Sequence, residues 1–258
     1  DNITKYLDSN IVKGLNIYKS TDFSNSIKIK HLLNHTSGIA DYYMDKNSDG
    51  KRLLDFMLLE PEHFWEPLET INYAKEQLKS HFQPGNGFHY SDTNYQLLGL
   101  IIEKITSKPL HEVLDKYIFT PLKMENTYQI FYSEPKVKSN FPMAKIYHDG
   151  HDLTQFKSIS LSWASGGTVS TANDMYKFHK ALVENKLISS ETFSKMQDWA
   201  RFGPGIRYGY ALMNFRLPLM PRKYEIWGNS GSIGAYMYYN PAMDAYLIGT
   251  FNNINYQV

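Results

Sequence analysis

The sequence contains no cysteine, and this absence removes several kinds of site at once. Without a thiol there is no disulfide, no thiolate metal site and no cysteine nucleophile. The sequence also has no excess of positive or negative charge: it contains 27 Lys and Arg residues and 26 Asp and Glu residues, for a formal net charge of +1. That balance gives no electrostatic reason to expect nucleic acid or an anionic membrane as a partner.

Long apolar runs are absent as well. The longest uninterrupted stretches, such as 100–102, are a few residues long, whereas a helix that spans a membrane needs about 20. The chain is rich instead in hydrophobic residues (42%) and in aromatic ones (15%), which excludes a disordered chain. Its 258 residues are enough to bury a sizeable core.

Helical patterns dominate the first two thirds of the chain. The hydrophobic periodicity predicts helices over 69–80 and 93–107, and the second of these carries an apolar stripe formed by Leu98, Ile101, Ile102 and Ile105. Pro109 is placed to start a further helix, because a proline in the first turn costs no hydrogen bond. We expect one side of that helix to carry Val113, Leu114 and Tyr117.

Two more helices are predicted from capping residues later in the chain. Thr171 and Asp174 resemble a capping box that opens a helix reaching about Asn185. Ser190 is predicted to cap the helix that follows.

The last fifty or so residues predict strands instead. Short aromatic or β-branched runs alternate there with turn-forming residues, at 206–216, 223–228, 233–240 and 244–252. This pattern is typical of an antiparallel meander. Helices first and strands last predict an α+β fold in which helices cover an antiparallel sheet, and the beginning of the chain shows no partner strands for that sheet.

Two histidine clusters are candidates for metal sites. His31 and His35 are four residues apart, as on one helix face, but a metalloprotease needs Glu next to the first His, where Leu32 stands. The segment 148–152 contains the turn dipeptide Asp-Gly and predicts an exposed hairpin tip. A structural role is favoured for both clusters, and we expect neither a metal nor an organic cofactor.

Several familiar catalytic loops are missing from the sequence. It contains no G-x-S-x-G nucleophile elbow and neither of the two glycine-rich phosphate loops. Four other segments stand out together: HLLNHTSGI (31–39), YSDTNYQLLG (90–99), SGGTVSTANDMYKF (165–178) and GNSGSIGAYMYYNP (228–241).

In this order and at these spacings, the four segments resemble the serine β-lactamase and penicillin-binding-protein superfamily. The class C-like branch, which also holds D-aminopeptidases, D,D-carboxypeptidases and esterases, is the most similar. The resemblance covers nearly all of residues 1–258 and implies a single β-lactamase/transpeptidase-like domain. It further implies a mostly helical region over 28–140, helices plus an antiparallel sheet over 141–258, and a site in the cleft between them.

The nucleophile of the superfamily is the Ser of an S-x-x-K helix that precedes the HTSG segment. Residues 1–7 already resemble the stretch after that helix, so we expect the nucleophile and its Lys to lie before residue 1. Ser48-x-x-Lys51 and Ser133-x-x-Lys136 match the letters, but Gly50 and Pro135 disfavour the helix that would bring the amine beside the hydroxyl. We interpret both matches as loops.

The resemblance implies catalytic roles for two residues at the start of the second segment. Tyr90 would be the proton shuttle; the alternative is that it is one of 20 tyrosines and packs at a helix entry. Asp92 occupies the position of the family's Asn. An ionised Asp92 could pair with the nucleophile's Lys but could not donate a hydrogen bond, and Asp before a helix is also a favoured N-cap.

The fourth segment would bind the substrate. Asn229 stands where the family has Lys or His, and a neutral amide makes hydrogen bonds about half as strong as a charged donor, which disfavours penicillin-type carboxylate recognition. Ser230 and Gly231 would line the strand edge that aligns the substrate, and the Ser232 N–H would form half of the oxyanion hole. The alternative for this segment is a plain β-turn.

The same resemblance gives two segments a supporting role. Residues 35–38 are expected to be architectural rather than a Ser/His catalytic pair. Gly166 and Gly167 are expected to allow a close backbone approach near the site.

These expectations define an enzyme and two alternatives. A serine hydrolase would act through an acyl-enzyme on an ester, a D-amino-acid amide or a peptidoglycan-like or β-lactam substrate, so the expected partner is a small molecule or a peptide. The departures at Asp92 and Asn229 favour instead a catalytically inactive binding or regulatory domain, and a purely structural fragment is the third option. The 258 residues alone are predicted to be inactive. The family's habit indicates a location outside the cytoplasmic membrane, and the oligomeric state is not predicted.

Overall fold

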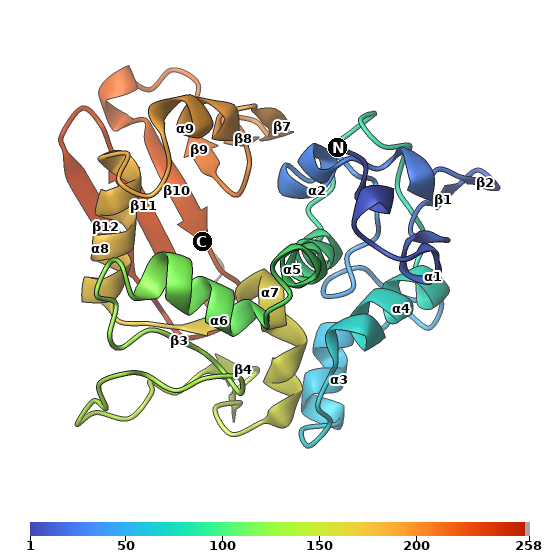
Figure 1. Cartoon of the computed structure of the whole chain (residues 1–258), viewed down its shortest axis with the longest axis horizontal. Coiled ribbons are helices and arrows are strands. Elements are labelled where there is room, and N and C mark those ends of the chain that lie inside the picture. Colours follow the sequence, from blue (N-terminus) through green and yellow to red (C-terminus); the bar gives the residue numbers. More distant parts are fainter. Residues whose placement is uncertain (256–258) are drawn as a thin grey trace. The chain divides into compact units, whose positions relative to one another are not determined.

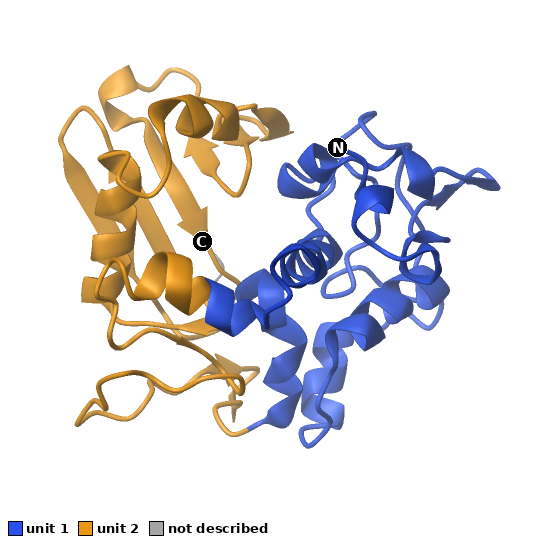
Figure 2. Cartoon of the chain, viewed as in Figure 1, with its two compact units in different colours: residues 1–113, 156–167 blue, residues 114–155, 168–258 orange. Residues whose placement is uncertain are grey.

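The computed structural model describes residues 1–255, and these form two compact units (Figure 2). Unit 1 comprises Asp1–Val113 and Phe156–Gly167, and unit 2 comprises Leu114–Gln155 and the chain from Thr168 onward. The chain therefore leaves unit 1, returns to it for one short segment, and then completes unit 2.

Unit 1 is mainly helical. Short 3₁₀ turns at Ile3–Lys5, Ser24–Ser26 and Lys157–Ser162 connect its elements. Its helices and its one named hairpin are α1 (Ser9–Val12), β1 (Ile17–Tyr18), β2 (Thr21–Asp22), α2 (Ile29–Leu33), α3 (Leu53–Leu59), α4 (Pro67–Gln77), α5 (Asp92–Thr106), most of α6 (Leu110–Leu114) and α7 (Trp163–Gly166).

Helix α5 lies at the centre of unit 1 (Figure 1), where α2, α4 and α7 contact it. Helices α4 and α5 confirm the two helices predicted from periodicity. The predicted apolar stripe of α5 is confirmed only in part, because Ile101 is buried and Leu98 packs against the main apolar core, but the stripe does not extend to Ile105. Ile105 is 60% exposed, whereas Leu97 is fully buried and packs with Ile101 in the main apolar core. The buried face of α5 also carries Asn94 and Gln96. A pattern of apolar residues alone could not locate a face that is partly polar.

Helix α6 begins directly after Pro109, as predicted, but it is short. It continues as a π-helical turn over Asp115–Phe119, and Tyr117 is exposed rather than packed on an apolar side. Within residues 1–255 the structure has no helix with the length and apolar character that crossing a bilayer requires.

Unit 2 is built on a six-stranded antiparallel sheet in the order β12-β11-β10-β9-β8-β7 (Figure 1). Because neighbours in the sheet are also neighbours in the sequence, the predicted meander is confirmed. The strands are β7 (Ala200–Gly203), β8 (Ile206–Tyr208), β9 (Met213–Phe215), β10 (Ile226–Ser230), β11 (Tyr236–Asn240) and β12 (Ala245–Gly249).

Two details of this sheet differ from the prediction. The run 206–216 is two strands rather than one, because the chain turns between β8 and β9, where Gly209 N–H donates to Leu212 O at 2.8 Å and Ala211 has a left-handed φ of 56°. Strand β7 was not predicted: it is a four-residue edge strand, Ala-Arg-Phe-Gly, whose two central residues are exposed, so it carries no buried apolar run.

Helices α8 (Ala172–Val183) and α9 (Ser190–Met196) provide the apolar cover of the sheet. Helix α8 contacts β11 and β12 (Figure 1). Leu182 of α8 and Phe193 of α9 pack with Trp227 of β10. The predicted α+β architecture, with helices on an antiparallel sheet, is therefore present within unit 2.

The caps of α8 and α9 test the predicted helix starts. Thr171 caps α8 as predicted, because its side chain accepts a hydrogen bond from Asp174 N–H at 3.2 Å. Helix α9 is capped one residue earlier than predicted: Ser189, not Ser190, accepts from Thr192 N–H at 3.2 Å.

Two further strand pairs belong to unit 2. Strand β3 (Tyr128–Gln129) pairs with β6 (Thr168–Val169), and β4 (Tyr147–His148) pairs with β5 (His151–Asp152). Asp149 (φ 47°) and Gly150 (φ 81°) form the tip between β4 and β5. The predicted Asp-Gly hairpin tip is confirmed, with the two positive φ values that a type I′ turn requires.

Candidate active site

Residues 35–38, the HTSG segment, support the part of the site that lies in unit 1. Helix α2 ends at Leu33, and His35 takes a left-handed φ of 57°, so His31 and His35 do not share a helix face. The loop between α4 and α5 runs along the segment through backbone hydrogen bonds: N–H groups of His81, Gly85 and His89 donate to the carbonyl oxygens of Gly38, Thr36 and His35 at 2.9, 2.8 and 3.0 Å.

Gly38 makes this close approach of two chain segments possible. Its φ is +73°, and a Cβ at this position would lie 2.0 Å from the backbone oxygen of Phe82. The amide of Asn16 donates to the same oxygen and to Ser37 O, both at 2.8 Å. The loop that leads to Tyr90 is therefore fixed by main-chain contacts before any side chain of the site is considered.

The imidazole of His35 is fully buried and neutral. Its Nδ1 accepts from Ser91 N–H at 3.0 Å and from Asn94 Nδ2 at 3.2 Å, so the ring proton is on Nε2. Burial lowers the pKa of His35 to about 3, and the nearby charge of His89 adds to this effect. His35 therefore orients the start of α5 without bringing a positive charge.

Ser37 has a structural role as well. It is fully buried, and its hydroxyl donates to Asn94 Oδ1 at 2.6 Å. A hydroxyl that is closed off from solvent and engaged with an amide is not placed to attack a substrate. The architectural role expected for the HTSG segment agrees with these contacts.

Tyr90 lies on the ring of His35. The two ring centroids are 4.2 Å apart with an interplanar angle of 28°, and the phenol keeps partial exposure to solvent. A side-chain hydrogen bond joins Tyr90 to Asp92. The predicted proton-transfer residue and the residue at the family's Asn position are thus in direct contact.

Asp92 is the first residue of α5, and Ser91, not Asp92, occupies the N-cap position. The N–H of Asp92 donates to Asp41 Oδ1 at 2.9 Å. Burial, together with the charge of Asp41, raises the pKa of Asp92 well above the usual carboxyl range, although the hydrogen bond with Tyr90 opposes this. Burial raises the pKa of Asp41 too. The two carboxyl groups together therefore favour fewer than two negative charges.

The other predicted residues lie at the end of β10 in unit 2. Asn229 and Ser230 are strand residues, so the alternative of a plain β-turn does not hold for this part of the segment. The turn starts one residue later, where Gly234 N–H donates to Gly231 O at 2.9 Å, and Ser232 lies within it. Asn229 Nδ2 donates to Ala211 O at 3.2 Å.

The strand ladders on the two sides of β10 have different lengths. Pairing with β9 ends at Gly228, opposite Met213, whereas pairing with β11 continues to Ser230, opposite Tyr236. The last two residues of β10 therefore extend beyond β9. This is the kind of strand end along which an extended substrate can add its own backbone hydrogen bonds.

The glycine pair and the two S-x-x-K matches can also be placed. A Cβ on Gly167 would lie 2.9 Å from Trp163 O, in agreement with a close backbone approach, but a Cβ on Gly166 would meet nothing within 4 Å, so that half of the expectation is wrong. Ser48–Lys51 and Ser133–Lys136 lie in loops, as predicted.

The structure thus brings the predicted residues together in two groups. Tyr90 and Asp92 contact each other in unit 1, and Asn229, Ser230, Gly231 and Ser232 follow one another at the end of β10 in unit 2. That the two groups act on one substrate stays a prediction.

Asp41 was missed by the sequence analysis. It lies 51 positions from Asp92, and no spacing rule connects the two residues. His81 and His89 were also missed, although a signal was present: they flank the turn-forming pair Pro84-Gly85, which brings the two sides of a loop together.

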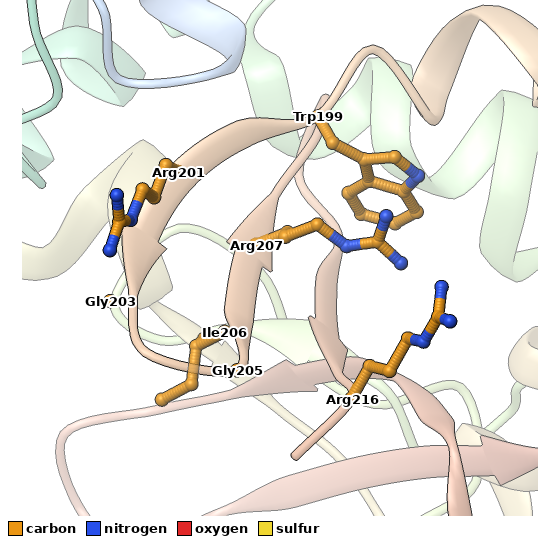
Figure 3. Close-up of a pocket in the computed structure, with 7 residues that line it drawn as sticks. All are labelled: Trp199, Arg201, Gly203, Gly205, Ile206, Arg207 and Arg216. Carbon is orange, nitrogen blue, oxygen red and sulfur yellow. The ribbon is translucent and has the colours of Figure 1, made fainter. Parts of the chain in front are cut away.

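A pocket of about 380 Å³ lies along β7, β8 and the end of β9 (Figure 3). Figure 3 shows the Arg207 side chain beside the indole of Trp199, and the guanidinium carbon is 5.4 Å from the ring centroid. Arg207 also hydrogen bonds Asn214 at 2.6 Å and lies 3.3 Å from Glu225. The lining of this pocket contains none of the predicted site residues.

Solved structures define the class of fold. The D-stereospecific amidohydrolase from Streptomyces sp. matches with a TM-score of 0.81 and 26% identity, covering 98% of this chain and 74% of that one. The D-amino acid amidase from Ochrobactrum anthropi SV3, complexed with D-phenylalanine, matches with a TM-score of 0.70 and 25% identity, covering 93% and 70%. The fold is β-lactamase/transpeptidase-like, as the sequence predicted.

The profile of the Beta-lactamase family matches residues 1–253, and the chain belongs to that family. Penicillin-binding protein 4* of Bacillus subtilis (strain 168) is 27% identical over 233 residues, covering 81% of this chain and 47% of the relative. The resemblance to the β-lactamase and penicillin-binding-protein superfamily is confirmed. The chain spans less than half the length of the first curated relatives that it matches.

Proposed function

We propose that this chain carries the Tyr90 and β10 parts of a serine hydrolase that acts through an acyl-enzyme. The observation on which the proposal rests is the arrangement at the start of α5: Tyr90 is stacked on a neutral, hydrogen-bonded His35 and contacts Asp92. A phenol held in one position by a rigid neighbour suits a proton-transfer group, because geometry is the first requirement of acid–base catalysis.

The nucleophile is proposed to be a Ser of an S-x-x-K helix supplied by a segment before residue 1. Both internal matches to that motif lie in loops, so neither has the helix that would bring the Lys amine beside the Ser hydroxyl. The Ser oxygen would attack the substrate carbonyl, and its proton would pass through Tyr90 to the departing amine or alcohol. Water would then hydrolyse the ester on the Ser.

The preferred substrate class is the amide of a D-amino acid. A substrate of this class has no free carboxylate beside the bond that is cleaved, so it needs no cation at position 229. Asn229 is neutral, and its amide already donates to Ala211 O within unit 2. The two solved structures with names of this kind, an amidohydrolase and an amidase, support the same choice.

Asp92 is proposed to replace the family's Asn in its protonated form. The raised pKa of Asp92 favours a carboxyl group that keeps its proton, and such a group has an O–H that can donate as an amide N–H does. Substitution of Asp92 by Asn is therefore expected to retain the activity of the complete protein, whereas Asp92→Ala is expected to lower it.

The experiment compares the 258-residue chain with the same chain extended by its natural preceding segment. We expect the extended protein to hydrolyse D-phenylalanine amide in preference to the L enantiomer and to be labelled by a fluorophosphonate. The 258 residues alone should not be labelled. Stable labelling of any Ser of the shorter chain would refute the proposed location of the nucleophile.

Tyr90→Phe tests the proton-transfer role in the extended protein. We expect kcat to fall by about 10²–10⁴, the usual contribution of a positioned acid or base. Tyr95→Phe is the matched control, because Tyr95 also packs on the His35 ring, at 5.3 Å, and its hydroxyl donates to Leu33 O. If both variants lose activity equally, Tyr90 serves packing alone.

A catalytically inactive binding domain is the second candidate. It is favoured by the two departures from the family pattern, Asp92 and Asn229. It predicts that the extended protein binds D-amino-acid amides or peptides but neither turns them over nor reacts with the fluorophosphonate. Measurement of binding and turnover on the same preparation separates the two candidates.

A further inference from the structure

Three side chains of unit 1 converge on one point beside the HTSG segment. Asp45 Oδ2 lies 2.8 Å from His81 Nε2 and 3.0 Å from His89 Nε2, and the three atoms all lie within 4.8 Å of one another. In the part of the chain that the structure describes, no other group of three His, Cys, Asp or Glu side chains meets this spacing.

We propose that Asp45, His81 and His89 bind a divalent transition-metal ion, with Zn²⁺ as the preferred ion. Two imidazole nitrogens and one carboxylate oxygen form a ligand set typical of zinc sites that leave a fourth position for water. Ca²⁺ and Mg²⁺ are disfavoured because they prefer oxygen ligands. Tetrahedral Zn²⁺ with bonds of about 2.0–2.2 Å places its ligand atoms about 3.3–3.5 Å apart, so shifts of about half an ångström would admit the ion.

The backbone holds all three ligands in place before an ion binds. His81 N–H donates to Gly38 O at 2.9 Å, and His89 N–H donates to His35 O at 3.0 Å. Asp45 N–H closes a turn on Asp41 O at 3.1 Å. A site whose ligands are already positioned loses little conformational entropy on binding.

The two imidazoles already share one partner atom, because both Nε2 atoms lie within hydrogen-bond distance of the same carboxylate oxygen of Asp45. Their rings are stacked, with centroids 3.5 Å apart and an interplanar angle of 24°, so the rings would have to splay apart for both in-plane lone pairs to meet one ion. That oxygen additionally accepts from Asp41 N–H at 2.8 Å. A cation between the two Nε2 atoms and Oδ2 would use both imidazole lone pairs and balance the carboxylate charge.

An ion can reach this group from solvent. The side chains of His81, His89 and Asp45 are 36%, 25% and 21% exposed. Entry therefore requires no unfolding of unit 1, and the exposed side leaves room for a water ligand. Bound metal would join the turn at Asp45 to the loop between α4 and α5. It would stabilise that loop whether or not the proposed acyl transfer occurs.

Titration of the metal-free 258-residue chain with Co²⁺ tests the proposal directly. We expect the visible d–d absorption of protein-bound Co²⁺ to saturate at one ion per chain. Zn²⁺ is expected to displace the Co²⁺, because Zn²⁺ binds such ligands more tightly. Zn²⁺ should also raise the melting temperature, whereas Mg²⁺ should not. Absence of Co²⁺ absorption and of a Zn²⁺ effect on melting would overturn the proposal.

His81→Gln is the diagnostic variant, and His63→Gln is its matched control. His63 pairs with one carboxylate, Glu69, at 2.9 Å, and its side chain is 37% exposed, close to the 36% of His81. We expect His81→Gln to lower Co²⁺ affinity by about 100-fold or more, since even loss of outer-shell partners costs 10- to 100-fold. His63→Gln should bind as the unmodified chain does. Equal losses in both variants would contradict the site.

Melting in the presence of EDTA separates metal binding from hydrogen bonding alone. If His81→Gln melts earlier than the unmodified chain in EDTA while Zn²⁺ stabilises neither protein, the three side chains are only a hydrogen-bonded anchor and the proposal fails. Should His81→Gln not fold, His89→Gln gives the same test from the second imidazole.

Discussion

His35 in unit 1 and His179 in unit 2 are both fully buried, but their neighbours differ in kind. The Nδ1 of His35 accepts hydrogen bonds from Ser91 and Asn94. His179 lies among the rings of Trp227 and two tyrosines, at centroid distances from 5.0 Å upward. Neither nitrogen of His179 has a hydrogen-bond partner among the described residues.

Each of the two histidines is typical of the contacts that stabilise its own unit internally. Unit 1 buries many polar side chains that connect segments far apart in the sequence, as Asn16, Asn94 and Gln96 do. The cover of the sheet in unit 2 is a cluster of apolar and aromatic residues around Trp227. Polar contacts have defined directions, so they specify one arrangement of segments. Tyr90 is placed by contacts of this directed kind.

The largest expected effect is that of Gly38→Ala, which tests whether the segments of unit 1 can separate. The added Cβ would meet the Phe82 carbonyl at 2.0 Å in a left-handed backbone, and we expect the free energy of unfolding to fall by more than about 4 kcal/mol. Gly50→Ala is the control, because Gly50 has a φ of +76° but open space around it, and should cost about 1–2 kcal/mol. Chemical denaturation measures the free energy of unfolding of both variants. Equal losses would show that the loop containing Phe82 moves to accommodate the added Cβ.

The same substitution at the two histidines tests the comparison itself. His35→Phe leaves Ser91 N–H and Asn94 Nδ2 without their buried acceptor, and should cost about 3 kcal/mol. His179→Phe removes a polar group that lacks partners and should change the stability by less than about 1 kcal/mol or raise it. Equal losses in chemical denaturation would break the distinction between the two units.

The pH dependence of stability tests the apolar environment of His179 in unit 2. Burial lowers the pKa of His179 from 6.5 to about 4, so the folded state disfavours the charged ring. Neutral His179 therefore contributes to the free energy of unfolding above pH 6.5. This contribution is lost as the pH falls through 6.5 towards 4, and the total loss is about 3 kcal/mol. His179→Phe should reduce the acid sensitivity of unfolding by that amount. An unchanged pH profile would show that His179 is hydrated or paired in solution.

The smallest expected effect concerns the helix caps of unit 2. Thr171→Ala removes the acceptor of Asp174 N–H and should cost about 1 kcal/mol. Ser189→Ala removes the equivalent bond from the shorter and more exposed α9, and should cost about half as much. Thermal denaturation of the two variants shows whether unit 2 also depends on directed polar contacts; a cost of several kcal/mol at either cap would make the units more alike.

Sequence patterns predicted those parts of the fold that depend on local periodicity. Helices α4 and α5, the meander and the cap at Thr171 follow from spacing and residue type, and all are present. The residues 206–216 were predicted as one strand instead of two, because aromatic and apolar residues on both sides of Gly209 form a continuous strand-like pattern. Ala211 completes the turn between β8 and β9 with a left-handed φ, and alanine is not a residue type that predicts such a backbone conformation.

The supporting contacts of the site could not be predicted in the same way. The burial of Asn94 and Gln96 depends on partners at positions 35, 37 and 161, and hydrogen bonds over such separations leave no periodic trace. The coupling of Asp41 with Asp92 is of the same type. Family motifs located Tyr90 and Asp92, but the physical reason for their position lies in these long-range contacts.

The three backbone hydrogen bonds between the loop after α4 and the HTSG segment also limit how this chain can change in length. Residues 81–89 contain no named strand, but these three N–H groups tie the loop to particular carbonyl oxygens of the HTSG segment. Adding or deleting a residue there would shift every later N–H donor by one position. The Tyr90 ring would then no longer stack on the His35 ring. Insertions used to engineer or diversify this protein belong elsewhere, for example at the open turn around Gly50, where a side chain would meet nothing.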